Sequence, residues 1–363
     1  MQQKQSTKQG SVWLRHGWQF AALVWLPFCL GSLWLSWQPG PDLSGEGMVQ
    51  TANLAETLAA AETALADLTE SRAALAEAVS ESTAAAQKQA AEIQTLTKTS
   101  QEQKEYAKIA YETMIVNRLG RATMEQKGSR SEIMIFPLEK ADYRGYMAKI
   151  KLKTKDALAV TVAPADQPQG ETTLEAVQRL GGILGVNGGG FASQTKDGVA
   201  RLVPMGNTMV AGELVGGFQP AANDFAFAGF DQKNRLVGGS YQTETALRQS
   251  GAWQGVSFVP ALIRDWEKTE IPAKWQNARQ PRTVLGQYPN GDVFFLVVDG
   301  RQSDWSNGIT LEELQDFLLE LGVMEAFNLD GGGSSTFVYD GTVKNKPSDG
   351  SPRRLATNLV VRL

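Results

Sequence analysis

The sequence predicts three parts with different structures: a helix that spans a membrane, a long coiled-coil helix, and a C-terminal domain of strands and helices. Three observations support this division. A long uncharged stretch follows a basic N-terminus, a stretch without proline or glycine comes next, and the remaining chain alternates short apolar runs with glycine-rich turns. The last pattern is typical of strands and helices that pack around a common core.

The composition limits the chemistry that the chain can perform. Its 363 residues suffice for roughly two or three domains, and its net charge of −4 gives no electrostatic case for binding nucleic acid. The one cysteine, Cys29, excludes an intrachain disulfide and a CxxC metal site. The one histidine, His16, lies near the N-terminus. A site in the C-terminal part must therefore use carboxylates, Arg, Lys, Tyr, Ser, Asn and backbone groups.

Residues 1–17 form a basic tail, and residues 18–38 are predicted to be a membrane anchor. The tail contains Lys4, Lys8 and Arg15 but no acid, and the anchor is uncharged with tryptophans near both ends. This length can cross a bilayer as a helix, and tryptophans favour the two interfaces. The basic tail places the N-terminus in the cytoplasm and the rest of the chain outside the plasma membrane. A cleaved signal peptide is the alternative, but no small-x-small cleavage site follows closely.

Residues 39–48 are predicted to be a linker, and residues 49–118 a coiled-coil stalk. The linker contains prolines and glycines, whereas the stalk has neither and is rich in Ala, Glu, Gln, Lys and Thr. From Leu54 to Leu96, positions spaced alternately three and four residues apart are mainly apolar. After Leu96, fewer of these positions are apolar. Such a heptad repeat indicates a coiled coil, which would make the chain a homodimer. The alternative is a single solvated helix rich in alanine.

Residues 119–131 are predicted to be a second linker, and residues 132–363 a domain large enough for its own core. Within it, alternating or continuous apolar runs indicate strands, and two Thr-x-x-Glu spacings indicate helix starts with capping boxes. The predicted strands are 147–153, 157–162, 183–186, 293–298, 325–329, 336–339 and 358–363, and the predicted helices are 172–180 and 310–321.

The stretch from Asn328 to Phe337, NLDGGGSSTF, is the clearest sign of a binding site. It runs from an apolar strand into an acid, three glycines and two serines. Consecutive glycines weaken a regular element, but they allow positive φ and the close approach of another molecule to the backbone. Asp330, Ser334 and Ser335 would then face one small volume, which suits a polyol or a phosphate. The alternative is a β-hairpin with a glycine bulge.

Polar residues follow three of the predicted strands. They are Asn187 with two glycines after it, Asp299 with Arg301, and Asp330. If the three strands share a sheet and a direction, all three groups lie at one edge, where ligands bind in α/β sheets.

The order of these motifs resembles that of the phosphodiester glycosidase family. The resemblance covers about residues 133–363, and NLDGGGSST is its most specific stretch. The chain departs from the family pattern at Gly190, where an aromatic residue is expected before Phe191. The motifs, in chain order, are Asn187-Gly188-Gly189, Arg282-Thr283, Asp299-Gly300-Arg301, Gly308 with Leu311 and Glu313, Asn328 to Thr336, Pro347-Ser348, and Arg353-Arg354 ahead of Asn358.

The resemblance implies an α+β fold, with a mixed β-sheet and flanking helices, and hydrolysis of a sugar-1-phosphodiester. Guanidinium groups suit a phosphate because they bind its oxygens in pairs and stay charged. Carboxylates would stabilise an oxocarbenium-like transition state. The candidate catalytic residues are Asp299, Asp330, Arg301 and Glu313, and the candidate substrate-binding residues are Asn187, Gly188, Gly189, Arg282, Asn328, Gly331, Gly332, Ser334, Ser335 and Arg354, with Arg353 as a further candidate for the phosphate.

Several of these residues also have purely structural interpretations. Arg301 could pair with a neighbouring acid, and Asp330 could cap its own turn. Glu313 stands at the third position of a predicted helix, where it would complete a capping box. At most one of Arg353 and Arg354 is expected to face the site, because both precede the last strand.

The sequence therefore predicts an enzyme outside a bacterial plasma membrane that acts on a glycosyl-phosphate polymer, an exopolysaccharide or a glycolipid of the envelope. No cofactor is expected. No ligand spacing demands a divalent metal, although the acidic clusters could supply ligands for one. The alternatives are a phosphosugar-binding module in envelope assembly and a structural head on the stalk. Asp299, Arg301 and Asp330 together favour the enzyme, because a binding module needs no particular set of carboxylates.

Overall fold

The structure is a computed structural model, which describes residues 51–222 and 224–363. The chain divides into two compact units, Met1–Glu92 and Ile93–Leu363. The basic tail, the predicted anchor at 18–38 and the linker at 39–48 lie outside the described residues. Among the residues that are described, no helix is both long and apolar enough to cross a membrane.

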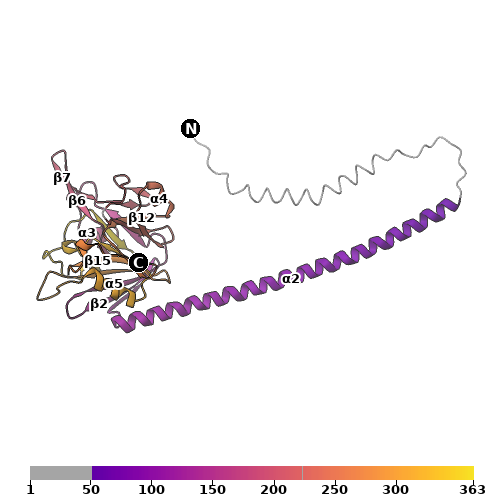
Figure 1. Cartoon of the computed structure of the whole chain (residues 1–363), viewed down its shortest axis with the longest axis horizontal. Helices are drawn as coiled ribbons and strands as arrows, with labels where there is room; N and C mark the ends of the chain where they lie inside the picture. Colours follow the sequence, from indigo (N-terminus) through magenta and orange to yellow (C-terminus); the bar gives the residue numbers. More distant parts are fainter. Residues whose placement is uncertain (1–50, 223) are drawn as a thin grey trace. The chain divides into compact units, whose positions relative to one another are not determined.

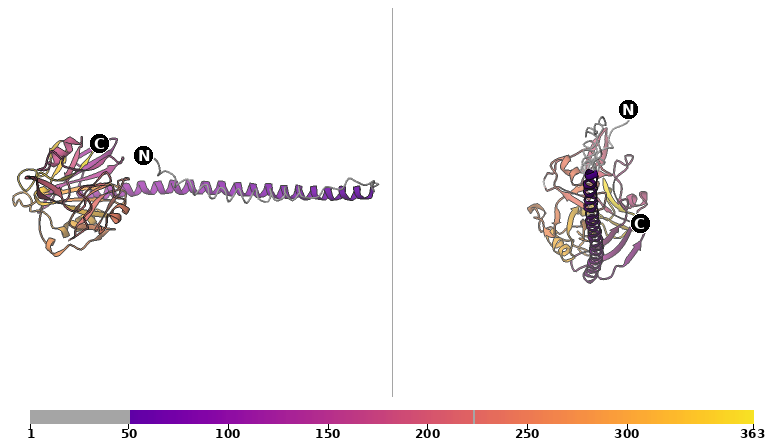
Figure 2. Two further views of the ribbon diagram at one scale, coloured as in Figure 1. Left: turned by 90° about the horizontal axis from the view of Figure 1, so that it is seen from above. Right: turned by 90° about the vertical axis from the view of Figure 1, so that its right-hand side faces the viewer.

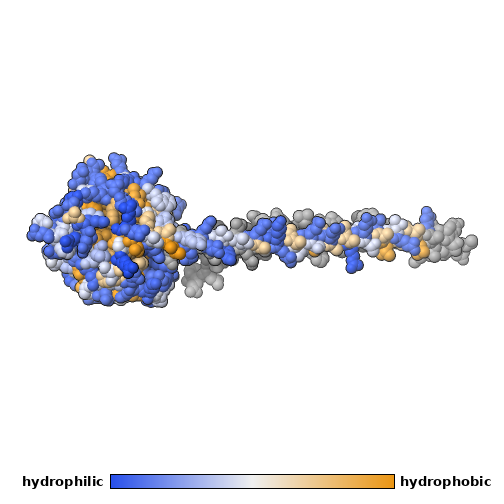
Figure 3. Space-filling model, turned by 90° about the horizontal axis from the view of Figure 1, so that it is seen from below, coloured by the Kyte–Doolittle hydropathy of each residue, from blue (hydrophilic) through white to orange (hydrophobic). Residues whose placement is uncertain are grey.

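The described part of the first unit is helical. Helix α2 extends from Thr51 to Leu119, close to the predicted 49–118, and Figure 2 shows an unbroken helix over residues 51–92. Figure 3 shows apolar side chains spaced among polar ones along this segment. Five of the heptad side chains are 58–68% exposed: Leu58, Leu65, Leu68, Leu75 and Val79. The helix is therefore confirmed, whereas its pairing with a second copy stays a prediction.

The largest sheet of the second unit has eight strands. Its eight strands have the order β1-β2-β3-β16-β15-β17-β13-β14. In chain order they are β1 Met124–Lys127, β2 Ser131–Glu139, β3 Arg144–Leu152, β13 Ala261–Arg264, β14 Glu267–Lys268, β15 Arg282–Gln287, β16 Val293–Val298 and β17 Glu325–Leu329.

Two five-stranded sheets and a hairpin complete the unit. One sheet has the order β19-β18-β5-β20-β4, with β4 Leu158–Val162, β5 Leu184–Asn187, β18 Phe337–Tyr339, β19 Thr342–Val343 and β20 Thr357–Val361. The other has the order β11-β10-β12-β8-β9, with β8 Met209–Val210, β9 Glu213–Leu214, β10 Ala226–Phe230, β11 Leu236–Gly239 and β12 Gln254–Phe258. The hairpin pairs β6 Phe191–Lys196 with β7 Val199–Pro204.

All the pairings between these strands are antiparallel, so the expected mixed sheet is wrong. The helices are few and short: α3 Thr173–Arg179, α4 Glu244–Gln249 and α5 Leu311–Glu320, with 3-10 turns η1 Ala273–Trp275 and η2 Gly332–Ser334. Both predicted capping boxes are present, at Thr172 before α3 and at Thr310 before α5. Short loops join β2 to β3, β10 to β11 and β15 to β16, and such loops favour antiparallel pairing because parallel strands need long crossover connections.

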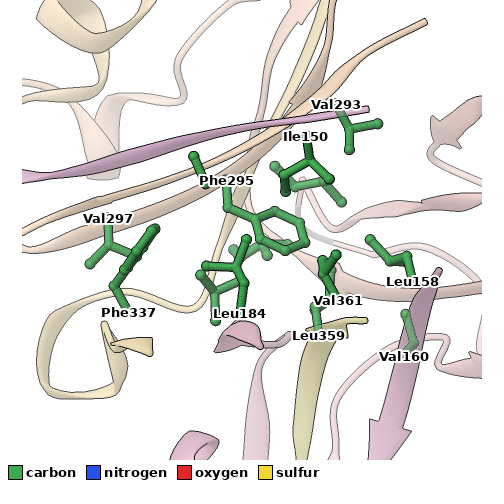
Figure 4. Close-up of a cluster of buried hydrophobic side chains, with 14 of the residues drawn as sticks. Ile150, Leu158, Val160, Leu184, Val293, Phe295, Val297, Phe337, Leu359 and Val361 are labelled. Carbon is green, nitrogen blue, oxygen red and sulfur yellow. The ribbon is translucent and has the colours of Figure 1, made fainter. Parts of the chain in front are cut away.

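The sheets and helices form stacked layers. One face of the eight-stranded sheet packs against the two five-stranded sheets, and Figure 4 shows side chains from both sides of this interface. Its other face is covered by α5, and α3 packs on the outer side of β18 and β20. Figure 1 shows α3 and α5 on either side of β15. Strand β16 is apolar throughout because Phe295 lies in the first interface and Phe294 in the second.

The end of α2 belongs to the core of the second unit. Ile115 is 1% exposed and lies in the same cluster as Tyr288 and the α5 leucines. Glu112 lies 3.6 Å from Lys149 of β3, and Arg118 forms a 3.1 Å ion pair with Glu320 of α5. The segment predicted to be a linker, 119–131, contains strand β1, which pairs with β2. A fragment that begins at residue 132 would therefore lose both a strand and part of the core.

Replacing Ile115 by alanine is expected to lower the free energy of unfolding of the second unit by about 2 to 4 kcal/mol, because it leaves a cavity in a closed core. Ile109 is the matched control, since it is on the same helix but 58% exposed, and Ile109→Ala should change little. Denaturant unfolding followed by tryptophan fluorescence measures both. Equal losses in the two variants would show that the end of α2 is not part of this core.

Candidate active site

Three strand ends of the large sheet lie together. Strands β16 and β17 run in the same direction on either side of β15, and β15 runs in the opposite direction. The start of β15 therefore lies beside the ends of its neighbours: Arg282 is opposite Val298, and Thr283 is opposite Leu329. This register brings the segments after β16 and β17, which begin at Asp299 and Asp330, to one edge with Arg282.

The third predicted group reaches the same edge from another sheet. Asn187 ends β5, which pairs with β18 and β20, so the expectation of one shared sheet is wrong. Its side chain nevertheless joins the layers: Nδ2 donates to the Asp330 carbonyl at 2.5 Å, and Oδ1 accepts from Thr283 Oγ1 at 2.8 Å and from the Thr336 N–H at 3.1 Å. Because the two sheets pack face to face, their strand ends can meet without sharing hydrogen bonds.

The glycine stretch crosses from one sheet to the other. Strand β17 belongs to the eight-stranded sheet and β18 to the five-stranded sheet. The alternative interpretation as a β-hairpin is therefore wrong, because the two strands do not pair. The connection between them contains the single 3-10 turn η2, and its backbone is held by the Asp330 N–H to Gly188 carbonyl bond at 3.2 Å and the Gly332 N–H to Pro281 carbonyl bond at 3.0 Å.

Each of the three glycines leaves room for a different group. A Cβ atom on Gly331 would lie 2.8 Å from the Pro281 carbonyl oxygen. One on Gly332, whose φ is +59°, would lie 3.0 Å from Nη2 of Arg301. One on Gly333 would overlap both Nη2 of Arg353 and Oδ2 of Asp349. The run of glycines thus permits close packing against the turn, and two of the three neighbouring groups include arginine side chains.

A cavity of about 420 Å³ opens beside this turn. Its volume is within the range typical of small-molecule sites. It contains four basic side chains and one carboxylate, an arrangement that attracts an anion. The lining residues are Phe258, Lys274, Trp275, Ala278, Gln280, Arg282, Arg301, Asp330, Gly331, Gly332, Gly333 and Arg353, and we call this space the arginine cavity.

Asp330 is the carboxylate of the arginine cavity. Burial raises the pKa of Asp330 to about 6, while a hydrogen bond from Ser334 and the charge of Arg353 act to lower it. A carboxyl group with such a pKa changes its protonation state near neutral pH, which is a common property of catalytic acids and bases. Its backbone is already bonded to Asn187 and Gly188.

Three arginines approach the arginine cavity from different elements. Arg282 is 4% exposed and donates to the Ala278 carbonyl at 2.7 Å, and burial lowers its pKa to about 10, so it stays charged at neutral pH. Arg301 follows β16 with a left-handed φ of +60°, and its Nε donates to Gln280 Oε1 at 2.6 Å. Arg353 precedes β20 and donates from Nη1 to Ser334 Oγ at 3.4 Å. A non-glycine residue in the left-handed region is uncommon and often has a functional reason.

Asp299 is placed behind the arginine cavity and does not line it. It is 2% exposed, and its carboxylate accepts from Trp305 Nε1 at 2.9 Å, from Asn345 Nδ2 at 2.9 Å and from the Lys346 N–H at 3.0 Å. Burial raises the pKa of Asp299, and these hydrogen bonds act in the opposite direction. These contacts connect the loops that follow β16 and β19, and Asp299, which was predicted to be catalytic, does not line the arginine cavity.

Two further predicted residues also lie elsewhere. Glu313 closes the capping box of α5 by accepting from the Thr310 N–H at 3.1 Å, and it pairs with Arg279 and does not line the arginine cavity. Arg354 donates to the Gly170 carbonyl at 2.7 Å and to Glu175 at 2.8 Å, near the start of α3. The arginine that faces the cavity is therefore Arg353, which agrees with the expectation that only one of the two would.

The remaining predicted residues support the glycine turn from behind. Asn328 is buried and donates to the Val259 carbonyl at 2.6 Å, and the Ser335 carbonyl accepts from Asn345 at 3.0 Å. Gly188 and Gly189 both donate to Thr357, through its carbonyl and its Oγ1 respectively. Gly331 and Gly332 do line the cavity, and Ser334 bonds Asp330.

Sequence reasoning missed several lining residues. Lys274, Trp275 and Gln280 come from the segment before β15, which carries no recognisable motif, although Gln280 lies two residues before Arg282. Phe258 ends β12, and its ring lies where a Cβ on Gly190 would be 3.0 Å away. Within residues 51–222 and 224–363, no three His, Cys, Asp or Glu side chains come together in a way that could hold a metal ion.

A second cavity, of about 390 Å³, lies next to the first one. Phe258, which lines the arginine cavity, packs edge-to-face against Phe225, which lines the second, with ring centres 6.4 Å apart. Tyr241, Asn207 and Gln219 also line it, and none of its lining residues is charged. We call it the uncharged cavity. An anionic ligand is therefore expected in the arginine cavity and not here.

Comparisons with known proteins support the resemblance. A family model described as phosphodiester glycosidase matches residues 181–362, which is half of the chain. The bovine N-acetylglucosamine-1-phosphodiester alpha-N-acetylglucosaminidase is 31% identical over 213 residues, covering 52% of this chain and 38% of that protein. The SPbeta prophage-derived uncharacterized protein YomE of Bacillus subtilis is 30% identical over 197 residues, covering 53% of this chain and 29% of that protein. The chain thus spans less than half the length of these relatives.

A solved structure shows the same fold. The catalytic domain of zebrafish N-acetylglucosamine-1-phosphodiester alpha-N-acetylglucosaminidase aligns with a TM-score of 0.52 and 24% identity, over 67% of this chain and 87% of that one. The family match includes β15, the glycine turn and Arg353, and so contains most of the arginine cavity. This chain belongs to the phosphodiester glycosidase family.

Proposed function

We propose that the chain hydrolyses the bond between the anomeric carbon of a sugar and a phosphodiester. One observation carries the proposal: the carboxylate of Asp330 lies in a cavity that also contains Arg282, Arg301 and Arg353. An enzyme of this class needs cations for the phosphate and a carboxylate for the sugar, and the arginine cavity supplies both. Family membership and the activity in the bovine relative's name support the same reaction.

The arginines would bind and stabilise the phosphate group. Guanidinium groups form paired hydrogen bonds to phosphate oxygens and remain charged throughout the pH range of most enzymes. As the bond breaks, its electron pair stays on the bridging oxygen, and the phosphate leaves as a monoester. Arg301 and Arg353 flank the glycine turn and stabilise the charge that develops there. A phosphate is a good leaving group, so the cavity needs no histidine or other general acid for this step.

Asp330 would act on the sugar side of the same bond. The sugar ring becomes positively charged in the transition state, and an ionised carboxylate nearby stabilises it. Asp330 then serves either as the nucleophile, with water releasing the sugar afterwards, or as the base that takes a proton from the attacking water. Both roles require the ionised form, and the pKa of about 6 therefore places the acidic limit of activity near that pH.

A binding module without turnover remains the principal alternative. It would use the same arginines for a phosphosugar but would gain nothing from Asp330, whose negative charge opposes the binding of an anion. The ionisable carboxylate inside a basic cavity therefore favours an enzyme.

The rest of the chain suggests where the enzyme works. We propose that residues 18–38 anchor it in the plasma membrane with the second unit outside, so that its substrate is a glycosyl-phosphate polymer or glycolipid of the envelope. Residues 49–118 would then act as a stalk, and the exposed seam formed by Leu58, Leu65, Leu68, Leu75 and Val79 would pair two copies as a coiled coil.

Purified full-length chain is expected to release sugar from at least one member of a panel of glycosyl-1-phosphodiesters. Asp330→Asn and Arg301→Ala should each lower kcat/KM at least a hundredfold, because they remove the carboxylate or a phosphate ligand. Arg248→Ala is the control, since Arg248 pairs with Glu244 outside the cavity and should keep the parent rate. Binding of sugar phosphates without any turnover would instead identify a binding module.

Asp330→Asn and Asp299→Asn are expected to change stability in opposite directions. Asp330 has a raised pKa, so the folded state loses stability as the pH rises from about 4 to about 6, and an asparagine avoids this loss. At pH 8 the free energy of unfolding of Asp330→Asn should therefore exceed that of the parent by roughly 2 kcal/mol. At pH 4 the two proteins should have equal stability. Asp299→Asn should lose about 2 kcal/mol, since its amide cannot accept from all the donors around it.

Urea unfolding at the two pH values measures both effects. A loss of stability in Asp330→Asn at pH 8 would show that its carboxylate is structural, like that of Asp299.

Leu68→Lys combined with Leu75→Lys is expected to separate the proposed dimer, because two lysines in the seam would repel their counterparts. Ala66→Lys combined with Ala73→Lys adds the same charges on another face of the helix and should leave the dimer intact. Sedimentation equilibrium of residues 49–363 gives the masses. A parent that sediments as a monomer at micromolar concentration would rule out the coiled coil.

A further inference from the structure

The segment before β20 contains an ion pair that the sequence motifs do not predict. Asp349 Oδ2 accepts from Nη2 of Arg353 at 2.5 Å and from Nε at 3.2 Å. The two side chains are 40% and 42% exposed. Exposed ion pairs contribute little to stability. Stability alone therefore gives little reason for this arrangement.

The geometry of the pair is tied to the glycine turn. Asp349 binds one edge of the Arg353 guanidinium group, and Nη1 on the other edge lies 3.4 Å from Ser334 Oγ. Ser334 in turn hydrogen-bonds the carboxylate of Asp330. Gly333 has no side chain where the Arg353–Asp349 pair lies against the turn, and a Cβ there would overlap both groups. The pair is thus packed against the turn that carries Asp330.

We propose that Asp349 is a positioning residue, which holds the guanidinium group of Arg353 against the glycine turn so that it can contact a phosphate bound beside Asp330. This inference rests on the proposed function, because the phosphate is that of the glycosyl phosphodiester. A long arginine side chain loses many rotamers when it is held in one position. Fixing it before the substrate arrives lowers the cost of binding, which is the general benefit of preorganisation.

The same contact influences Asp330 through charge. The positive charge of Arg353 lowers the pKa of Asp330 against the effect of burial. The other charged groups that line the cavity around Asp330 are Lys274, Arg282 and Arg301. If Arg353 loses its fixed position, its charge is on average farther from Asp330. The pKa of Asp330 then rises, and the acidic limit of activity moves to higher pH.

Asp349→Asn separates positioning from a simple effect of charge, because the two predict opposite signs. Removing a negative charge near the cavity would by itself strengthen phosphate binding and lower the pKa of Asp330. Loss of positioning weakens phosphate binding and raises that pKa. For Asp349→Asn we expect KM for a phosphodiester turned over by the parent to increase at least fivefold, and the acidic limb of the pH profile to move up by half a unit or more.

The experiment uses the full-length chain, with kinetics on that phosphodiester and calorimetric titration with inorganic phosphate. Asp349→Glu keeps the carboxylate and should restore most of the parent affinity. Glu244→Gln is the matched control, because Glu244 pairs with Arg248 at the same spacing and with similar exposure but outside the cavity. It should match the parent in every measurement.

The outcomes distinguish this inference from the proposed function. Parent-like KM and pH profile in Asp349→Asn, or tighter phosphate binding, would overturn the positioning role while the function stands. If the parent turns over no phosphodiester, the proposed function is wrong. The phosphate titration alone then decides whether Asp349 positions Arg353. Weaker phosphate binding by Asp349→Asn than by the parent then supports positioning, and equal affinity or no binding by the parent overturns it.

Discussion

The site depends on one packing constraint: three groups lie against the backbone of the turn after β17, each about 3 Å or less from where a Cβ atom would stand. They are the Pro281 carbonyl, the guanidinium group of Arg301, and the Arg353–Asp349 pair. A methyl group at Gly331 would meet the backbone carbonyl of Pro281, whereas one at Gly332 or Gly333 would require the neighbouring charged side chains to move. Because two of the three neighbours are arginines, the glycines bring positive charge close to Asp330, which immediately precedes them. The glycines therefore account both for the close packing of this turn and for the positive charge near Asp330.

The layered fold brings the other parts of the site to this turn. Strand β15 places Arg282 beside the ends of β16 and β17. The pairing register of these three strands therefore brings Arg282 close to the segments that follow β16 and β17. Asn187 then joins the second sheet to the first through bonds to Asp330, Thr283 and Thr336. Residues from distant parts of the chain thus meet at the ends of packed strands, where the backbone is rigid and the side chains are free to take part in chemistry.

Local sequence patterns predicted the helices and strands well, but they did not predict which strands pair with one another. The capping boxes before α3 and α5 and the apolar strand β16 could be read directly, because each depends on residues close in sequence. Sheet membership could not, since nothing in the sequence of β5 says that it pairs with β18 and β20. The same limit applies to the position of Asp299 behind the cavity, because its partners Trp305, Asn345 and Lys346 come from two separate loops. A carboxylate after a strand looks the same whether it faces a ligand or fastens loops.

A structure of the Asp330→Asn chain with an uncleaved glycosyl phosphodiester would test the account most directly. We expect phosphate oxygens within hydrogen-bond distance of Arg301 and Arg353. The anomeric carbon should lie roughly 3 to 3.5 Å from the side chain of residue 330 if this residue is the nucleophile, or be separated from it by one water molecule if it is the base. A phosphate bound in the uncharged cavity beside Tyr241, or an anomeric carbon directed towards Asp299, would contradict it.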